Sequence, residues 1–250
     1  MDFLSDFVYV NKHSLIKALE SLKKNYFILF TGIAYTIINM LAFSVIGVAL
    51  SGPLSIISGF LLYFIQSAII SNYFYLLFNI INYNRFNFND FKQGFMYFIW
   101  KVYGVLFIIY LGQLLLSALS NILGSNAYIV NIIIQIGVLI LFNPLAETIY
   151  LKGLSPQDTI LYTLDFMKEN FVNWLLPNAV LLFVLYLITG QLITNLFNTG
   201  IGFNFDFSII AIARYLLGQL VFSFMMIYRG HLFRLLSTST MRKRKFMNKF

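Results

Sequence analysis

Six long stretches of this chain contain almost no charged side chains. Their approximate bounds are residues 26–50, 54–82, 97–120, 127–150, 171–196 and 207–230. An α-helix needs about 20 consecutive apolar residues to cross a hydrocarbon core that is roughly 30 Å thick. Each stretch therefore has the length of one membrane crossing. The sequence predicts a multi-pass integral membrane protein with six transmembrane helices.

The composition excludes a soluble fold. Of the 250 residues, 60% are hydrophobic and 10% are charged, whereas about 25% of the residues in a typical soluble domain are charged. Runs such as Ile132-Ile133-Ile134 do not alternate with polar residues, as the strands of a membrane β-barrel would. Since a helix satisfies its own backbone hydrogen bonds in lipid, we expect an all-α polytopic membrane protein.

The basic residues predict the orientation of the spans. Lys and Arg gather before the first span, after the second and fourth spans, and after the sixth. The other three loops, one of which is Ser51-Gly52-Pro53, contain no Lys or Arg. Cytoplasmic loops are enriched in basic residues. We therefore expect both termini in the cytoplasm and the protein in the cell (inner) membrane.

An internal repeat precedes the odd-numbered spans. Residues 14–26 align without a gap with residues 159–171, so that Asn25 coincides with Asn170, and a weaker third copy starts at Asp90. Each copy has the apolar spacing of a short amphipathic helix in the cytoplasmic interface. We predict three repeated hairpins, each preceded by an interfacial helix. The repeat units are 11–83, 87–152 and 155–236, in one membrane domain (1–236) followed by a basic tail (237–250).

This pattern of interfacial helix and hairpin, repeated in a six-span chain with a basic tail, resembles a broad group of bacterial membrane proteins. The group includes the membrane domain attached to some glycerophosphodiester phosphodiesterases. The resemblance covers most of the chain and implies a six-span fold. The catalytic phosphodiesterase barrel is absent from this chain, so that activity does not carry over, and no functional residues of the family are assigned.

Arg214 interrupts the apolar sixth span. It lies about 10 Å below the outer end of that span, at 1.5 Å per residue, and charged residues at such depth often mark functional sites. Amide side chains share the outer half of the protein: Gln113, Asn131, Gln135, Gln191, Asn195 and Gln219. The four-residue spacing within Asn131/Gln135 and within Gln191/Asn195 predicts that each pair shares a helix face.

Two interpretations of Arg214 remain open. In the first, Arg214 and the amides line an outward-facing cavity that binds a carboxylate, a phosphate or a lipid headgroup. In the second, Arg214 extends to the outer headgroups while the amides join helices to one another.

Glu147 is an acidic residue inside the fourth span. Asn143 and Pro144 precede it, and Pro144 is expected to kink the helix and free a carbonyl group; Pro177 is expected to do the same in the fifth span. Candidate partners at the cytoplasmic end are Lys101, Arg229 and His231. The site is interpreted either as an inner gate or cation site, or as a structural ion pair beside a proline kink.

The tail is polybasic. Its cationic residues are Arg242, Lys243, Arg244, Lys245 and Lys249. Contact with anionic membrane lipids is one expectation, and a disordered topology signal is the other.

The residues that enzymes and metal sites need are scarce. The chain has no Cys and two His, so we expect no metal site and no cofactor. Motifs of intramembrane proteases, P-loop proteins and haem proteins are missing, and we expect no enzyme. The net charge is +8. The basic residues that produce it lie next to the spans, where membrane topology and anionic lipid account for them, so no nucleic-acid partner is expected.

These observations favour a transport function. The chain is interpreted as a transporter, or as the membrane subunit of one, that binds or moves a small or lipid-like anion. Since an ATPase domain is missing, active transport would require other membrane subunits, an ATPase or an ion gradient. The alternative is a non-transporting accessory, scaffold or lipid-binding membrane protein.

Overall fold

The computed structural model describes residues 3–50, 55–124, 127–241 and 243–244, and these residues form helices and connecting segments without a strand. The elements are α1 (Phe3–Lys24), the 3-10 helix η1 (Tyr26–Phe30), α2 (Thr31–Ala49), α3 (Ser55–Tyr83), α4 (Phe88–Tyr97), α5 (Ile99–Leu123), α6 (Ala127–Leu141), α7 (Leu145–Lys152), α8 (Pro156–Thr189) and α9 (Ile209–Thr238). The predicted loop Ser51-Gly52-Pro53 lies outside the described residues.

Six helical stretches are long and apolar enough to cross a membrane. They are Tyr26–Ala49, Ile57–Tyr83, Ile99–Ile122, Ala127–Lys152, Pro156–Thr189 and Ile209–Thr238. The prediction of an all-helical chain with six such helices is therefore confirmed for the described residues. The chain is a multi-pass membrane protein by the length and composition of its helices.

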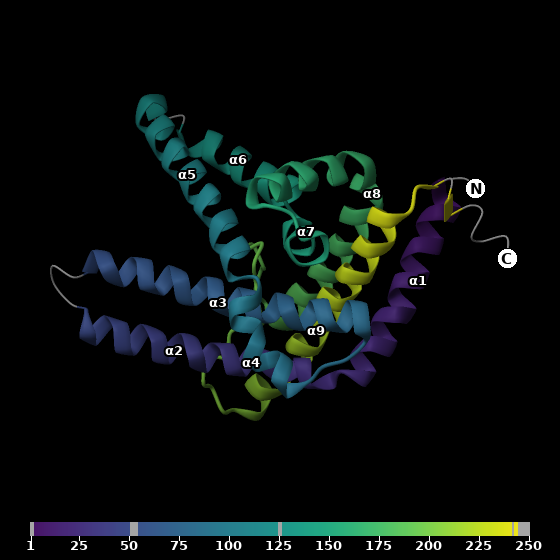
Figure 1. Cartoon of the computed structure of the whole chain (residues 1–250), viewed down its shortest axis with the longest axis horizontal. Coiled ribbons are helices and arrows are strands. Elements are labelled where there is room, and N and C mark those ends of the chain that lie inside the picture. Colours follow the sequence, from purple (N-terminus) through teal and green to yellow (C-terminus); the bar gives the residue numbers. More distant parts are fainter. Residues whose placement is uncertain (1–2, 51–54, 125–126, 242, 245–250) are drawn as a thin grey trace.

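Successive spans lie side by side, and the pairs diverge from one another. Figure 1 shows α2 beside α3, α5 beside α6, and α1 against the end of α9. The start of α1 and residues 239–241 lie at this end of α9. We call the end of the molecule that holds the start of α1 and the end of α9 the termini end. Because the pairs separate away from it, most of the buried core lies in the half of the molecule nearer to the termini end.

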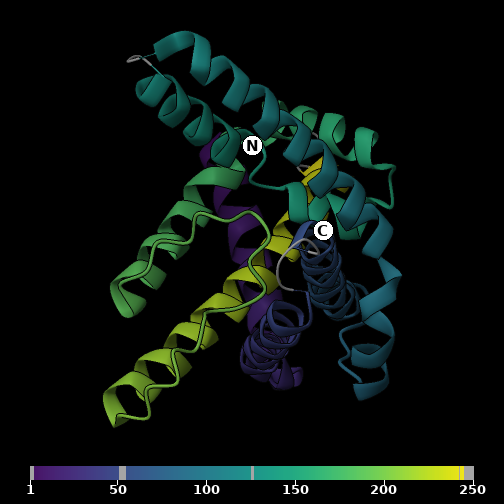
Figure 2. The same cartoon turned by 90° about the vertical axis from the view of Figure 1, so that its left-hand side faces the viewer.

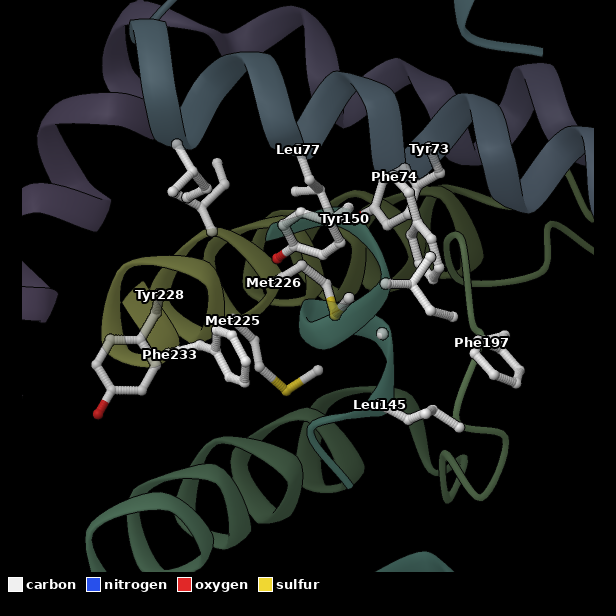
Figure 3. Close-up of a cluster of buried hydrophobic side chains, with 14 of the residues drawn as sticks. Tyr73, Phe74, Leu77, Leu145, Tyr150, Phe197, Met225, Met226, Tyr228 and Phe233 are labelled. Carbon is white, nitrogen blue, oxygen red and sulfur yellow. The ribbon is translucent and has the colours of Figure 1, made fainter. Parts of the chain in front are cut away.

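The core forms where α3, α7 and α9 meet. Phe74 of α3 packs on Tyr150 of α7 with ring centroids 5.5 Å apart, and Met226 of α9 lies beside Tyr150 (Figure 3). Leu77 and Phe233 extend this cluster along α3 and α9. This packing holds the short helix α7 between two spans and sets the position of its acidic residue.

Two opposite faces distinguish α1. The face toward α9 buries small or polar side chains at helical spacing: Asp6, Val10, Ser14, Ala18 and Ser21. Small residues allow two helices to approach closely. Leu4, Val8 and Leu19 are exposed. Thus α1 packs through its small residues and leaves an apolar stripe uncovered.

The fourth span is broken, as Pro144 predicts. α6 ends at Leu141 and α7 begins at Leu145, with a turn between them. Proline ends a helix because it lacks an N–H donor and clashes with the preceding turn. Pro177 lies inside α8, where the backbone stays helical, and the one residue of α8 with non-helical dihedrals is Asn170 (φ −124°, ψ 17°). The expected kink at Pro177 stays a prediction.

The aligned residues Asn25 and Asn170 have similar backbones. Asn25, between α1 and η1, has φ −117° and ψ 41°. Each asparagine donates a side-chain hydrogen bond to the carbonyl four residues earlier, Asn25 to Ser21 at 2.8 Å and Asn170 to Phe166 at 3.1 Å. In both places an amphipathic helix gives way to a span at an asparagine.

The fifth span ends earlier than predicted. α8 stops at Thr189, and Gly190 takes the left-handed conformation (φ 70°) that commonly ends a helix. Residues 190–208 are not helical. The prediction of a span over 171–196 is therefore wrong at its end, because the apolar residues Leu192, Ile193 and Leu196 belong to a non-helical segment.

The segment 190–208 returns toward the core. Figure 2 shows it folding back from the end of α8, crossing to α9 and running along α9 to its start. Phe197 is buried, and its ring centroid lies 6.2 Å from that of Phe74 in α3. The backbone of Gly200 approaches Gly32 so closely that an added Cβ would lie 2.8 Å from the Gly32 Cα. Non-helical backbone at membrane depth is tolerated where protein buries it or where it lines a cavity.

Candidate functional site

A buried ion pair lies between α7 and α9. The Arg229 Nε donates to Glu147 Oε1 at 2.7 Å, and its Nη2 donates to Glu147 Oε2 at 3.0 Å. The exposed fractions of the two side chains are 8% and 0%. Of the three expected partners of Glu147, the structure therefore selects Arg229. His231 instead lies 3.0 Å from the Ser21 hydroxyl, and Lys101 lies over the ring of Phe98.

The break before α7 supplies two more ligands for Arg229. Its Nη2 donates to the Asn143 carbonyl at 2.7 Å, and its Nη1 donates to Asn143 Oδ1 at 3.2 Å. The Asn143 carbonyl lies in the turn between α6 and α7 and accepts no backbone hydrogen bond among the described residues. Asn143, Pro144 and Glu147, three of the four residues predicted for the inner site, thus form one constellation with Arg229. Pro177 contributes no hydrogen bond to this constellation among the described residues.

Trp174 of α8 completes this constellation, and sequence analysis missed it. Its Nε1 donates to Asn143 Oδ1 at 2.8 Å. The Arg229 guanidinium lies 5.1 Å from the centre of the Trp174 ring, a distance at which a cation is attracted to the ring face. Since Trp174 follows the bend at Asn170, its position depends on that bend. The sequence contains little indication of this role, because Asn143 and Arg229, the partners of Trp174, are far from it along the chain.

The pair is neutral as a whole but asymmetric in its hydrogen bonds. A guanidinium carries five N–H donors, and the four bonds to Glu147 and Asn143 use four of them. One Nη1 donor is left. Tyr73 and Tyr150 are fully buried nearby in the core, and their hydroxyl groups have no partner among the described residues. The site therefore holds unused polar groups inside an apolar core.

A small cavity of about 40 Å³ reaches this site. Arg229 and Asn143 line it together with Leu182 of α8 and the segment 193–196. Asn195, which was predicted to lie in the outer cluster, lines this cavity and accepts a hydrogen bond from the Phe197 amide. The non-helical segment 190–208 thus forms one wall of the cavity at Arg229.

A second cavity of about 220 Å³ lies at the end opposite the termini end. Arg214 and Gln191 line it, and so do Asp206 and Tyr215. Arg214 and Asp206 are both exposed, and neither has an ion-pair partner among the described residues. The polar surroundings expected for Arg214 are therefore present, but their members differ from the predicted set.

The predicted outer cluster does not form as one site. Gln219 is buried, and its Oε1 accepts a hydrogen bond from the Ile201 amide at 3.0 Å. Asn131 donates to the Ser120 hydroxyl at 2.9 Å and joins α6 to α5. Gln113 and Gln135 are exposed on these two helices and are not among the described residues that line the three cavities.

The shared helix face expected for Gln191 and Asn195 is also wrong. α8 ends at Thr189, so both residues belong to the non-helical segment. Gln191 lines the cavity of Arg214, whereas Asn195 lines the cavity of Arg229. Because the backbone between them is not helical, these two residues line different cavities although they are four positions apart.

A third cavity of about 510 Å³ opens at the termini end. α8 contributes Asn170 and Asn173, and residues 236–241 of the C-terminal segment line the other side. Asn173 is buried, and its Oδ1 has no hydrogen-bond partner among the described residues. The rings of Phe166, Trp174 and Phe233 contact one another beside this cavity, with centroids 4.5–6.0 Å apart.

The described part of the basic tail binds the protein itself. The Arg244 Nε and Nη2 each donate to a carboxylate oxygen of Asp6 at 2.7 Å, and both side chains are buried. The expected contact of Arg244 with lipid is therefore wrong, because Asp6 on α1 neutralises it. Lys243 is exposed and lines the cavity at the termini end. Arg242, Lys245 and Lys249 lie outside the described residues.

No cluster of three or more metal-ligating His, Asp or Glu side chains occurs in the described parts of the chain. Comparison with family models, with curated proteins and with solved structures found no match. The arrangement of α8, α9 and the segment between them is therefore the basis for assigning a function.

Proposed function

We propose that this chain is a transporter, or the membrane subunit of one, which binds or moves a small or lipid-like anion along α8 and α9. The observation that carries this proposal is the order of the three cavities. From one end of α9 to the other, they are lined by residues 211–215, 222–229 and 236–238. α8 lines the same cavities at residue 189, residue 182 and residues 162–173.

The gaps between the cavities are short. Phe222 lies seven positions after Tyr215, and Leu236 lies seven positions after Arg229, which corresponds to about 10 Å of helix in each case. The segment 190–208 contacts α9 in the first gap, where the Ile201 amide donates to Gln219 Oε1. We infer that the Arg229–Glu147 pair with Trp174 closes the second gap. A solute that follows this route would meet Arg214 first and Arg229 second.

The proposed route has a direction. The distribution of Lys and Arg supports a cytoplasmic location for both termini. The cavity at the termini end then opens to the cytoplasm, and the cavity of Arg214 opens to the outside. In the same orientation, the exposed apolar stripe of α1 lies at the level of the inner headgroups.

We also infer that the three pairs of spans are copies of one unit. The matching backbones of Asn25 and Asn170 support this inference. Phe98, between α4 and α5, is similar, with φ −106° and ψ 4°. In each unit an amphipathic helix meets its span at one residue with non-helical dihedrals.

Exchange at Arg229 supplies a mechanism for the inner step. An arriving anion competes with Glu147 for the guanidinium, because both bind through charge-assisted hydrogen bonds. The unused Nη1 donor offers a first contact before the Glu147 bonds break. Release of Glu147 would free α7 from α9, and that change would open the way to the cavity at the termini end.

Uptake into vesicles tests the proposal. Purified protein is reconstituted into liposomes, and entry of radiolabelled inorganic phosphate, acetate and phosphoethanolamine is followed. We expect uptake of at least one of them above protein-free vesicles, reduced by Arg214→Gln. Arg85→Gln is the matched control, because Arg85 is exposed in the α3–α4 loop, far along the chain from the cavities. Uptake that is absent, or equal in the two variants, contradicts the proposal.

One observation favours the alternative, an accessory protein that binds other membrane subunits. In the most apolar stretches of the third and fourth spans, 11% and 17% of the residues are buried. Leu115, Leu119 and Ile133 are among the exposed side chains of α5 and α6. A partner subunit that covers this pair would co-purify with the protein from native lipid, and this outcome combined with absent uptake favours the accessory function.

A further inference from the structure

The cavity of Arg214 carries two opposite charges. Arg214 projects from the second turn of α9, and Asp206 lies just before that helix. Both line the cavity of about 220 Å³, and both lack an ion-pair partner among the described residues. An unpaired cation and an unpaired anion in one cavity differ from a simple anion site, in which a carboxylate would repel the ligand.

Asp206 is held in its charged form. Its Oδ1 accepts a hydrogen bond from the Ser208 amide at 2.9 Å. Hydrogen bonds from the backbone and the side chain of Ser208 lower the pKa of Asp206 below its usual value, because they stabilise the carboxylate. Asp206 therefore remains an anion at neutral pH and is available to bind a cation.

Aromatic rings line the space around the two charges. The rings of Phe203 and Tyr215 are 5.0 Å apart and nearly perpendicular, and both residues line the cavity. Ring faces attract ammonium groups. Gln191 and Asn204, also in the lining, offer amide donors and acceptors. The cavity thus provides an anion-binding group, a cation-binding group and aromatic surface within one small volume.

Exposed apolar side chains follow Asp206 in the chain. Phe207, Ile209 and Ile210 are exposed by 73%, 87% and 73%. Ile209 is also the first residue of the sixth span, which places the cavity at the boundary between headgroups and hydrocarbon. Acyl chains would lie on these side chains when a headgroup occupies the cavity.

We propose that this cavity binds a zwitterion that carries a phosphate and an ammonium group, the chemistry of a phosphoethanolamine headgroup. Arg214 binds the phosphate through paired N–H donors, and Asp206 binds the ammonium. This inference rests on the proposed function in one respect: it names the solute that would enter the route along α8 and α9. Occupancy of the cavity itself does not require transport.

Binding to the purified protein tests the inference. Delipidated protein in detergent is titrated with phosphatidylethanolamine, with phosphatidylglycerol and with free phosphoethanolamine, and bound molecules are counted by native mass spectrometry. The variants are Arg214→Gln and Asp206→Asn, with Arg85→Gln as the control. Unchanged thermal melting of each variant verifies its fold.

We expect both cavity variants to weaken binding of phosphatidylethanolamine about tenfold or more, the effect of one lost charged hydrogen bond, and Arg85→Gln to leave it unchanged. Asp206→Asn should not weaken the binding of phosphatidylglycerol, because this lipid has no ammonium group. Binding of free phosphoethanolamine with the same dependence identifies the soluble group as sufficient, and binding of the lipid alone identifies the headgroup with its chains.

Two results overturn the inference. One is binding of phosphatidylethanolamine that neither variant changes. The other is stronger binding of both lipids in Asp206→Asn, which describes a plain anion site. The binding assay and the vesicle assay can fail separately. Binding of the zwitterion without any uptake supports this inference and contradicts the transport function. Uptake without binding of the zwitterion supports the transport function and contradicts this inference.

Discussion

Arg229 and Glu147 meet across the junction of α9 and α7 through two roughly parallel hydrogen bonds of 2.7 and 3.0 Å. Both side chains are nearly inaccessible to solvent. Taking two charges out of water costs free energy. The attraction within the pair offsets this cost only when its geometry is good and the remaining donors are satisfied. Here Asn143 accepts two of the three remaining donors, the ring face of Trp174 lies 5.1 Å from the guanidinium, and one Nη1 donor is left.

We predict that breaking this pair on one side is strongly destabilising. Glu147→Leu leaves a buried guanidinium without its counter-ion and should lower the free energy of unfolding by about 3–5 kcal/mol. The double variant Glu147→Leu/Arg229→Met should lose much less, because it leaves no unpaired charge. Unfolding in a titration from mild to denaturing detergent measures both. A single variant as stable as the double variant would contradict the assigned pair.

The contact between Asp6 and Arg244 predicts how the C-terminal segment is held. Asp6→Asn removes the carboxylate that accepts both bonds. The segment that begins at Ser239 should then detach from α1, and trypsin should cleave the basic tail faster. Asp165→Asn is the control, because Asp165 forms an exposed pair with Lys168, and exposed pairs contribute little. Equal cleavage rates for Asp6→Asn and the parent protein would contradict the contact.

The bend at Asn170 can be measured as a distance. Asn170→Ala removes the side-chain bond to the Phe166 carbonyl and favours regular helix, since Ala has the highest helix propensity. The chain has no Cys, so spin labels at Leu161 and Leu187, both exposed, would be unique. We expect the label distance to lengthen as α8 straightens. An unchanged distance means that tertiary contacts, and not Asn170, set the bend.

The close approach of Gly200 to Gly32 predicts a sharp difference between two glycines. Gly200→Ala places a Cβ 2.8 Å from the Gly32 Cα, and such overpacking typically costs about 1–3 kcal/mol. Gly202→Ala meets nothing within 4 Å and serves as the matched control. Thermal unfolding should separate the two variants. If both unfold alike, the segment 190–208 does not pack on α2 as described.

The six spans were predictable because each contains a predominantly apolar stretch of sufficient length. The break at Pro144 was also predictable, since proline stops a helix by local chemistry. The importance of Glu147 followed from the cost of a carboxylate in an apolar span. These features depend on a residue and its neighbours in the chain.

The features that depend on distant partners were not predictable. Leu192, Ile193 and Phe197 continue the apolar pattern of the fifth span, so hydropathy alone extends the helix through them, although Gly190 ends it. Trp174 gains its role from Asn143 and Arg229, which lie on other helices. Arg244 resembles a lipid-binding residue in sequence, and its partner Asp6 lies 238 positions away.

Chemical block of the middle cavity tests whether solute passes along α8 and α9. Asn195→Cys places a thiol in the lining of the cavity at Arg229. Gln135→Cys places one on exposed α6, away from the cavity linings. Each variant is reconstituted into vesicles, treated with a small membrane-impermeant methanethiosulfonate, and assayed for anion uptake.

We expect the reagent to abolish uptake by Asn195→Cys and to leave uptake by Gln135→Cys at its untreated rate. Uptake that survives complete modification of Asn195→Cys, or that falls equally in both variants, would contradict a route along α8 and α9.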